Sequence, residues 1–168
     1  MIFLLHLATT AIPASYSQCS NYTTINDPTR NVNYAGGTSA DQSYFSSGPQ
    51  WVRFEGAGGT QIPTSPVPSN QCNTYATGWY SGAMPTVEGS TTNGTVCYTW
   101  TSGNCSYNNQ IQVTNCGSYY VYYLSAPITT GLRYCTTNST TMSVARRSTT
   151  GLSSISNFFE SLWKKIIN

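Results

Sequence analysis

Six cysteines limit what this chain can fold into more than any other feature. Their number is even, they are spread over most of the chain, and no two of them have a CxxC spacing. They are Cys19, Cys72, Cys97, Cys105, Cys116 and Cys135. Without a CxxC pair or a nearby histidine, a zinc site is a poor explanation for them. Disulfides are the better interpretation, although these residues by themselves do not choose among the many pairings.

The N-terminus carries the pattern of a secretory signal peptide. Residues 1–17 begin with an apolar run and end in small residues before Gln18, where cleavage is expected. The run is too short to span a bilayer, and Pro13 interrupts it. A buried N-terminal strand or a short anchor is the alternative. A signal peptide would deliver the cysteines to an oxidising compartment, in which disulfides persist.

The composition is that of an extracellular β domain and not of a nucleic-acid-binding protein. Charged residues make up only 7% of the chain and the net charge is +2, so no basic stripe exists to neutralise phosphates. Aromatic residues reach 13%, with 13 tyrosines. The tyrosines could form a platform for stacking carbohydrate, but packing in the core and at its rim is the commoner role and the one we expect.

Four Asn-x-Ser/Thr sequons agree with an extracellular compartment. They begin at Asn21, Asn93, Asn104 and Asn138. Asn93 lies in an expected loop at 89–95 and is the most accessible by this interpretation. Asn104 has Cys105 as the middle residue of its sequon, which can hinder glycosylation. We expect some of the four asparagines to carry N-glycans.

Catalytic chemistry finds little support in the sequence. The only histidine, His6, lies within the predicted signal peptide, so the mature chain would have no Ser-His-Asp or Cys-His nucleophile. Any two of the remaining acids in the folded body could in principle flank a glycosidic bond. They are Asp27, Asp41, Glu55 and Glu88. Nothing in the sequence pairs them, so we expect four surface acids, no enzymatic activity, no metal and no cofactor.

An alternating stretch runs into a tight turn in the first half of the chain. In residues 51–55, Val52 and Phe54 can face inward while Trp51 and its alternate neighbours face outward, which is the period of a strand. Three glycines within residues 56–59 then permit backbone conformations that a side chain would forbid.

Further strands follow downstream. Residues 96–101 and 110–114 alternate, and residues 119–124 are apolar or amphipathic on both faces, as in the middle of a sheet. Short strands between Gly, Pro and Asn turns predict an all-β fold. We expect a small, disulfide-stapled, antiparallel domain like a β-sandwich.

A series of motifs runs through this body. Its first half is Trp51-x-Arg53-Phe54-x-Gly56-x-Gly58-Gly59, then Cys72-Asn73-Thr74, Trp79 and Cys97-x-x-Trp100. Its second half is Ser102-Gly103-Asn104-Cys105, then Cys116-Gly117-x-Tyr119-Tyr120-Val121-Tyr122-x-Leu124-x-Ala126-Pro127, and finally Tyr134-Cys135. In this order and spacing the motifs resemble the cysteine-rich domain family of uromodulin and of related pancreatic zymogen-granule and liver zona-pellucida glycoproteins. We therefore expect such a domain over residues 18–136.

The resemblance has several implications. It implies the disulfides Cys19–Cys116, Cys72–Cys135 and Cys97–Cys105, although the family pattern usually has more cysteines than this chain. It implies an extracellular recognition glycoprotein, and some members act as decoys whose mannose-rich glycans bind bacterial fimbrial adhesins. The stretch that matches the decoy sequon is Tyr-Leu-Ser at 123–125, without asparagine, so that glycan is not carried over.

The C-terminal part of the chain changes character. Residues 137–151 are Ser/Thr-rich and indicate a linker, and residues 152–168 have the pattern of an amphipathic helix. The apolar residues expected to contact a membrane or a partner are Phe158, Phe159, Leu162, Trp163, Ile166 and Ile167. Three interpretations remain open: packing on the β domain or on a second copy, binding at a membrane surface, or a chance pattern.

Two functional hypotheses of different classes follow. The first is a secreted, N-glycosylated, non-enzymatic module for recognition, adhesion or innate defence, which binds an extracellular protein, a glycan or a microbial surface ligand. The alternative is a membrane-active host-defence or toxin-like protein, in which the helix at 152–168 is the effector. A hydrolase is a distant third, because its acids lack acid–base partners.

Overall fold

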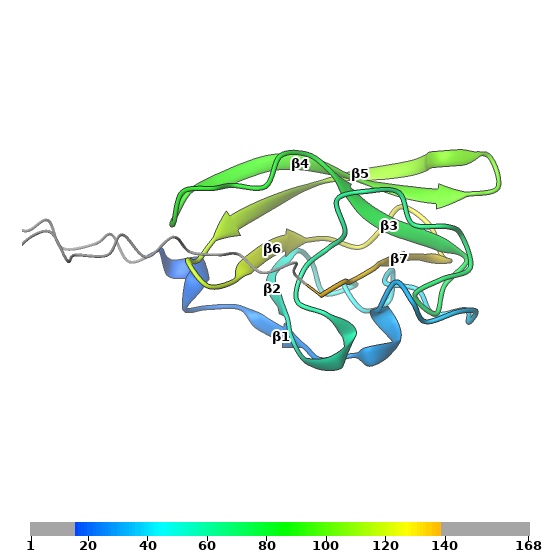
Figure 1. Cartoon of the computed structure of the whole chain (residues 1–168), viewed down its shortest axis with the longest axis horizontal. Coiled ribbons are helices and arrows are strands. Elements are labelled where there is room, and N and C mark those ends of the chain that lie inside the picture. Colours follow the sequence, from blue (N-terminus) through cyan, green and yellow to red (C-terminus); the bar gives the residue numbers. More distant parts are fainter. Residues whose placement is uncertain (1–15, 139–168) are drawn as a thin grey trace, which may run out of the picture.

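The computed structural model describes residues 16–138, which form an all-β domain (Figure 1). Seven strands make one hydrogen-bonded sheet in the order β1-β2-β6-β5-β4-β3-β7. They are β1 (Thr23–Ile25), β2 (Gln50–Phe54), β3 (Ala76–Ser81), β4 (Thr91–Trp100), β5 (Gly103–Asn115), β6 (Tyr120–Leu124) and β7 (Leu132–Tyr134). Short 3-10 turns lie at η1 (Ser17–Cys19), η2 (Pro28–Arg30) and η3 (Gly56–Gly58).

Some sequence predictions lie beyond this range. The predicted helix at 152–168 is outside the described residues, as are most of the linker at 137–151 and of the signal peptide at 1–17. These remain predictions. Between residues 16 and 138, no helix has the length and apolar character needed to cross a membrane.

The strands predicted from alternation are present, but the sheet is mixed and not purely antiparallel. β2, β6, β5, β4 and β3 pair in antiparallel fashion along the centre. At the two edges, β1 runs parallel to β2 and β7 runs parallel to β3. Parallel neighbours require a connection that returns the chain to the same end of the sheet, and the long segment 26–49 provides it for β1 and β2. The expectation of a wholly antiparallel sandwich was therefore wrong at the edges.

The two edges of this sheet meet. Beyond β1, Asn31 forms a parallel bridge with Thr136, which follows β7. The Val32 N–H donates to the Thr136 carbonyl (2.9 Å), and the Thr136 N–H donates to the Arg30 carbonyl (2.7 Å). The sheet therefore curls around its inner face. In Figure 1 the β4–β5 hairpin runs along one side of the molecule and β1 lies on the opposite side.

The larger of two hydrophobic clusters fills the inner face. It draws buried residues from every strand of the sheet and from the loops that close it. Four tyrosines in it are fully buried: Tyr80, Tyr98, Tyr122 and Tyr134. The expectation that tyrosines serve as core residues is confirmed for these four. Within β2 the alternation is also confirmed, because Val52 is 0% and Phe54 is 2% exposed.

The glycine turn after β2 serves close packing. A Cβ at Gly58 would lie 2.3 Å from the carbonyl oxygen of Asp27, so only glycine lets these two segments approach. Gly59 has φ +110, and a Cβ there would meet the backbone of Thr137 at 2.5 Å. The turn thus holds β2 against the segments that follow β1 and β7.

Three disulfides tie distant parts of the domain together. The bonds are Cys19–Cys116, Cys72–Cys135 and Cys97–Cys105. These are the same pairs that the family resemblance implies. The first anchors η1 next to β6, the second joins the loop before β3 to the end of β7, and the third closes the β4–β5 hairpin.

Candidate recognition surface

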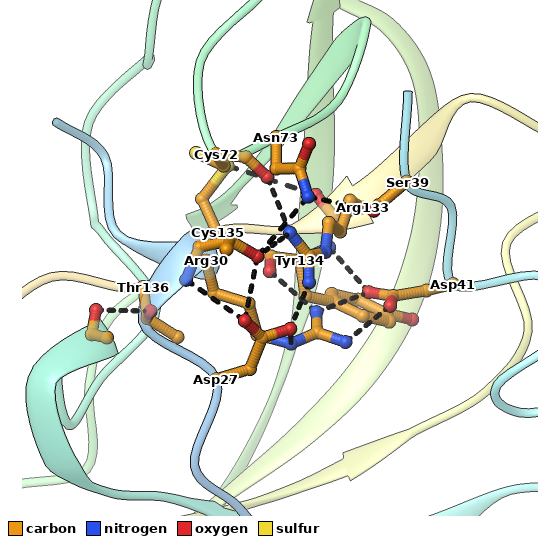
Figure 2. A network of polar contacts seen from close by, with 12 residues as sticks. Asp27, Arg30, Ser39, Asp41, Cys72, Asn73, Arg133, Tyr134, Cys135 and Thr136 are labelled. Carbon is orange, nitrogen blue, oxygen red and sulfur yellow. Dashed lines mark hydrogen bonds and ion pairs between the residues drawn. A yellow bond between two sulfur atoms is a disulfide. The ribbon is translucent and has the colours of Figure 1, made fainter. Parts of the chain in front are cut away.

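Two of the four acids, Asp27 and Asp41, form a polar region with two arginines. Asp41, expected at the surface, is only 1% exposed, so that prediction was wrong. Its carboxylate accepts two hydrogen bonds from the Arg30 guanidinium, at 2.6 and 2.8 Å (Figure 2). It also accepts the Tyr134 N–H (2.8 Å), and the Asp41 N–H donates to the Leu132 carbonyl (2.9 Å). β7 is the last strand in the order of the described sheet, so its backbone groups on that side need other hydrogen-bond partners. Asp41 is buried because it supplies those partners for Leu132 and Tyr134.

Asp27 and Arg133 complete this region, the ion-pair network of Asp27, Arg30, Asp41 and Arg133. Arg133 donates to the Asp27 carboxylate, to the Cys72 carbonyl (2.8 Å) and to the Thr29 hydroxyl (2.9 Å). Burial by itself would raise the pKa of Asp27, but hydrogen bonds from Thr29 and the charges of both arginines together lower it. Burial and the neighbouring Arg30 charge lower the pKa of Arg133.

The network lines a hollow of 440 Å³, yet its chemistry is structural. Each carboxylate is held by an arginine and by backbone or hydroxyl donors. Hydrolysis of a glycosidic bond needs one carboxyl group that is protonated at working pH, and the lowered pKa of Asp27 opposes that role. The other two acids do not join them: Glu55 pairs with Arg53 (2.9 Å), and Glu88 is exposed.

The second polar region is a row of side chains on the outer face of the sheet. Trp51 of β2 is in register with Tyr123 of β6, Tyr123 with Gln112 of β5, and Gln112 with Asn93 of β4. Their sequence neighbours, such as Val52 and Tyr122, are buried on the inner face, so all four side chains share the outer face. We call these four residues the outer row.

The outer row combines apolar rings with open amides. The Trp51 and Tyr123 ring centroids lie 5.3 Å apart, and Tyr123 is 37% exposed. Beside the rings is a hollow of 350 Å³ lined by Tyr123, Gln112, Asn93, Gln110 and Ile111. The side-chain amides of Gln112 and Asn93 make no hydrogen bond within residues 16–138. Each amide therefore keeps donors and an acceptor for another molecule.

One end of the outer face is closed by an arginine between two tyrosines. The Arg53 guanidinium lies 3.8 Å from the Tyr119 ring centroid and 5.7 Å from that of Tyr22, and it donates to the Tyr22 hydroxyl (2.9 Å). The Tyr119 hydroxyl donates to the Cys19 carbonyl (2.6 Å). Burial, followed by the interaction with Tyr22, raises the pKa of Tyr119. Because these groups bind one another, they leave fewer open donors than the amides of the outer row.

A second group of exposed rings lies at the far end of the β4–β5 hairpin. Tyr75 stacks on Trp100 with centroids 6.4 Å apart, and Trp100 contacts Tyr107 at 5.8 Å. Tyr75 is 46% and Tyr107 is 39% exposed. The hollow beside Tyr123 does not extend to these rings. They serve below as a comparison for the outer row.

All four sequon asparagines are exposed, but Asn93 is not in a loop. It lies in β4, because the stretch 91–95 pairs with 110–114 of β5. Gly94 indicated a turn by sequence; in the structure it makes room for a core ring, since a Cβ there would lie 2.3 Å from the Tyr80 hydroxyl oxygen. The strand thus continues through the sequon and places Asn93 in the outer row.

Comparison with known proteins decides the family. A family model for a uromodulin-like domain matches residues 52–136, which is half of the chain. The chain belongs to the uromodulin-like domain family. Among its relatives, the pancreatic secretory granule membrane major glycoprotein GP2 of Rattus norvegicus is 34% identical over 129 residues, 74% of this chain and 24% of the relative. Uromodulin of Mus musculus is 34% identical over 119 residues, 70% of this chain and 18% of the relative.

The uromodulin-like domain of this chain corresponds to only one part of those glycoproteins. For GP2 of Homo sapiens, which is 35% identical, the match likewise covers 72% of this chain and 22% of the relative. The chain therefore spans less than a quarter of the length of these relatives. Family membership and the three disulfides identify it as a secreted or extracellular cysteine-rich domain.

Proposed function

We propose that this uromodulin-like domain is a non-enzymatic recognition or adhesion module that binds an extracellular protein or glycan, including ligands on microbial surfaces, through its outer row. The observation that carries the proposal is the register of Trp51, Tyr123, Gln112 and Asn93 across four strands. A rigid sheet presents these side chains on one face, so little ordering is needed when a ligand binds.

The chemistry of the outer row favours a carbohydrate-bearing ligand. The rings of Trp51 and Tyr123 are tilted by 49° to each other, and each has an apolar face on which the C–H face of a sugar can pack. The amides of Gln112, Gln110 and Asn93 supply donors and acceptors for sugar hydroxyls beside these rings. Neutral groups of both kinds side by side suit an uncharged polyhydroxylated ligand better than a phosphate or a cation.

The organisation of the chain is part of the proposal. Residues 18–136 would be the recognition domain, released after removal of residues 1–17, with N-glycans on some of the four sequons. The alternative hypothesis of membrane activity depends on residues 152–168, which lie outside the described range, and no observation on the described residues favours it.

The test uses the full chain secreted from eukaryotic cells, with and without enzymatic removal of its N-glycans. The probe is a printed array of mammalian and bacterial-surface glycans. Trp51→Ala and Tyr123→Ala should each weaken binding by about tenfold, equivalent to about 1.4 kcal/mol. The matched control is Tyr107→Ala, which removes an equally exposed ring from the comparison group. An array without any bound glycan in either form would contradict a carbohydrate ligand, and an equal loss with Tyr107→Ala would contradict a role of the outer row in binding.

A further inference from the structure

One of the four sequons lies inside the outer row. Asn93 is exposed, its amide makes no hydrogen bond within residues 16–138, and it is opposite Gln112, which is opposite Tyr123. Adjacent strands are about 4.8 Å apart, so Asn93 and Tyr123 are separated by about 10 Å across β5. The hollow of 350 Å³ lies between them and is lined by both residues.

We propose that an N-glycan on Asn93 lies across this hollow and packs on the rings of Tyr123 and Trp51, so that glycosylation of Asn93 regulates access to the outer row. The first sugars of the glycan, attached to the Asn93 amide nitrogen, fold over the outer face toward Tyr123, which also lines the hollow. The regulatory consequence rests on the proposed function, whereas the packing of the glycan does not.

The hollow matches the chemistry of those first sugars. An N-acetylglucosamine ring has an apolar C–H face for the exposed Tyr123 ring, and its hydroxyl and acetamido groups can bond the open amide of Gln112. Gln110 also lines the hollow, and its side-chain amide donates to the Thr95 hydroxyl (2.9 Å). This bond orders the third residue of the sequon on the same face.

Asn138 provides a contrast within the same molecule. It also lies beside a hollow, of 610 Å³, but the lining there consists of prolines, small aliphatic residues and polar residues. No aromatic ring is among those lining residues, so a glycan on Asn138 has no ring to cover. The glycan-packing argument therefore applies to Asn93 and not to Asn138.

The experiment measures shielding directly and requires no ligand. The full chain is secreted from eukaryotic cells, glycan occupancy at each sequon is determined by mass spectrometry, and hydroxyl-radical footprinting then reports the reactivity of each aromatic side chain. Removal of the Asn93 glycan by Asn93→Gln should raise the labelling of Tyr123 and Trp51 several-fold. Labelling of Tyr75 and Tyr107, in the comparison group, should stay unchanged, and Asn138→Gln should leave the labelling of Tyr123 unchanged.

A second comparison removes the glycan only after the protein has folded, so that an effect of the missing glycan on folding is avoided. Treatment of the folded wild-type protein with a glycosidase that releases N-glycans should give the same increase at Tyr123 as Asn93→Gln. An unoccupied Asn93 in the secreted protein overturns the proposal, and so does equal labelling of Tyr123 with and without the glycan.

The glycan array separates this proposal from the proposed function. Shielding of Tyr123 without array binding in any form would leave the glycan packing intact and contradict recognition of a carbohydrate ligand. Array binding that is unchanged by removal of the Asn93 glycan would retain the recognition function and contradict the regulation.

Discussion

The ion-pair network and the outer row are both polar, and they differ in where their partners come from. Arg30 and Asp41 are 3% and 1% exposed and bond to each other and to β7, so their chemistry is completed inside the domain. Tyr123 and Gln112 are exposed, and the open amide of Gln112 finds no partner inside. Polar side chains whose hydrogen bonds are all made within the domain indicate a role in stabilising the fold. Polar side chains with open donors on a rigid face indicate a role in recognition.

The largest effect is expected from breaking the ion-pair network. Asp41→Asn should lower the free energy of unfolding by about 3–5 kcal/mol, because it removes the closest counter-ion of the buried Arg30 and leaves only Asp27 at 3.9 Å. Urea unfolding of the secreted protein measures the change. The double variant Arg30→Met/Asp41→Leu should recover part of the loss, since both charges leave together. A single variant as stable as the wild type would show that the network does not hold β7 in place.

The disulfides extend the comparison to loops of different length. Cys19–Cys116 spans 97 residues in sequence and Cys97–Cys105 spans 8. Replacing the first pair by Ala/Val should cost about 4–5 kcal/mol of unfolding free energy, and replacing the second about 2–3 kcal/mol, in the chain-entropy model. Thermal unfolding of the two double variants gives the order of the two losses. The opposite order would mean that the hairpin bond has an additional structural role.

The pH dependence of stability tests the contribution of Asp27 to the ion-pair network. The pKa of Asp27 in the folded protein is below its ordinary value of 3.8, so the native state binds its proton less readily than the unfolded state. The stabilisation is therefore fully present above pH 3.8 and is lost as the pH falls through the folded-state pKa. Asp27→Asn should remove this part of the acid dependence, as measured by urea unfolding between neutral and acidic pH. The control is Glu88→Gln, an exposed acid outside the network; an equal change there would contradict the assignment.

The smallest effect on stability is expected at the outer row. Gln112→Ala should change the free energy of unfolding by less than about 0.5 kcal/mol, because the amide has no partner to lose within the described domain. The same variant should weaken binding on the glycan array if the row is a recognition surface. If Gln112→Ala strongly destabilised the protein without loss of binding, the outer row would have a structural role and not a recognition role.

Local patterns predicted the strands that alternate strongly. The strands at 51–55, 96–101 and 110–114 were predicted from period-two spacing, and the central strand at 119–124 from its apolar character on both faces. The structure contains all four strands, and Val52 and Phe54 face inward as predicted. The strands β1, β3 and β7 were not predicted. β1 and β7 have only three residues each, which is too short for a period to show. In β3 burial does not alternate, because Ala76, Thr77 and Tyr80 are all buried.

The candidate site was less predictable than the strands. Trp51 was expected to face outward and Asn93 to be exposed, but nothing linked them to Tyr123 or Gln112. Asn93 was placed in a loop because Gly94 follows it, although that glycine accommodates Tyr80. Asp41 was placed at the surface because charged side chains are seldom fully buried, and its pairing with Arg30 is the exception that this rule allows.

The sequence by itself determined which residues face the core in β2 and in the stretch 110–114 of β5, because side-chain direction alternates with every residue and needs no distant partner. Through the family resemblance, it also implied the three cysteine pairs that the structure contains. Only the tertiary structure decided the parallel edges, the burial of Asp41 and the assembly of the outer row. Those features depend on which strands become neighbours and in which register. Such pairings join residues far apart in the chain, and no local period encodes them.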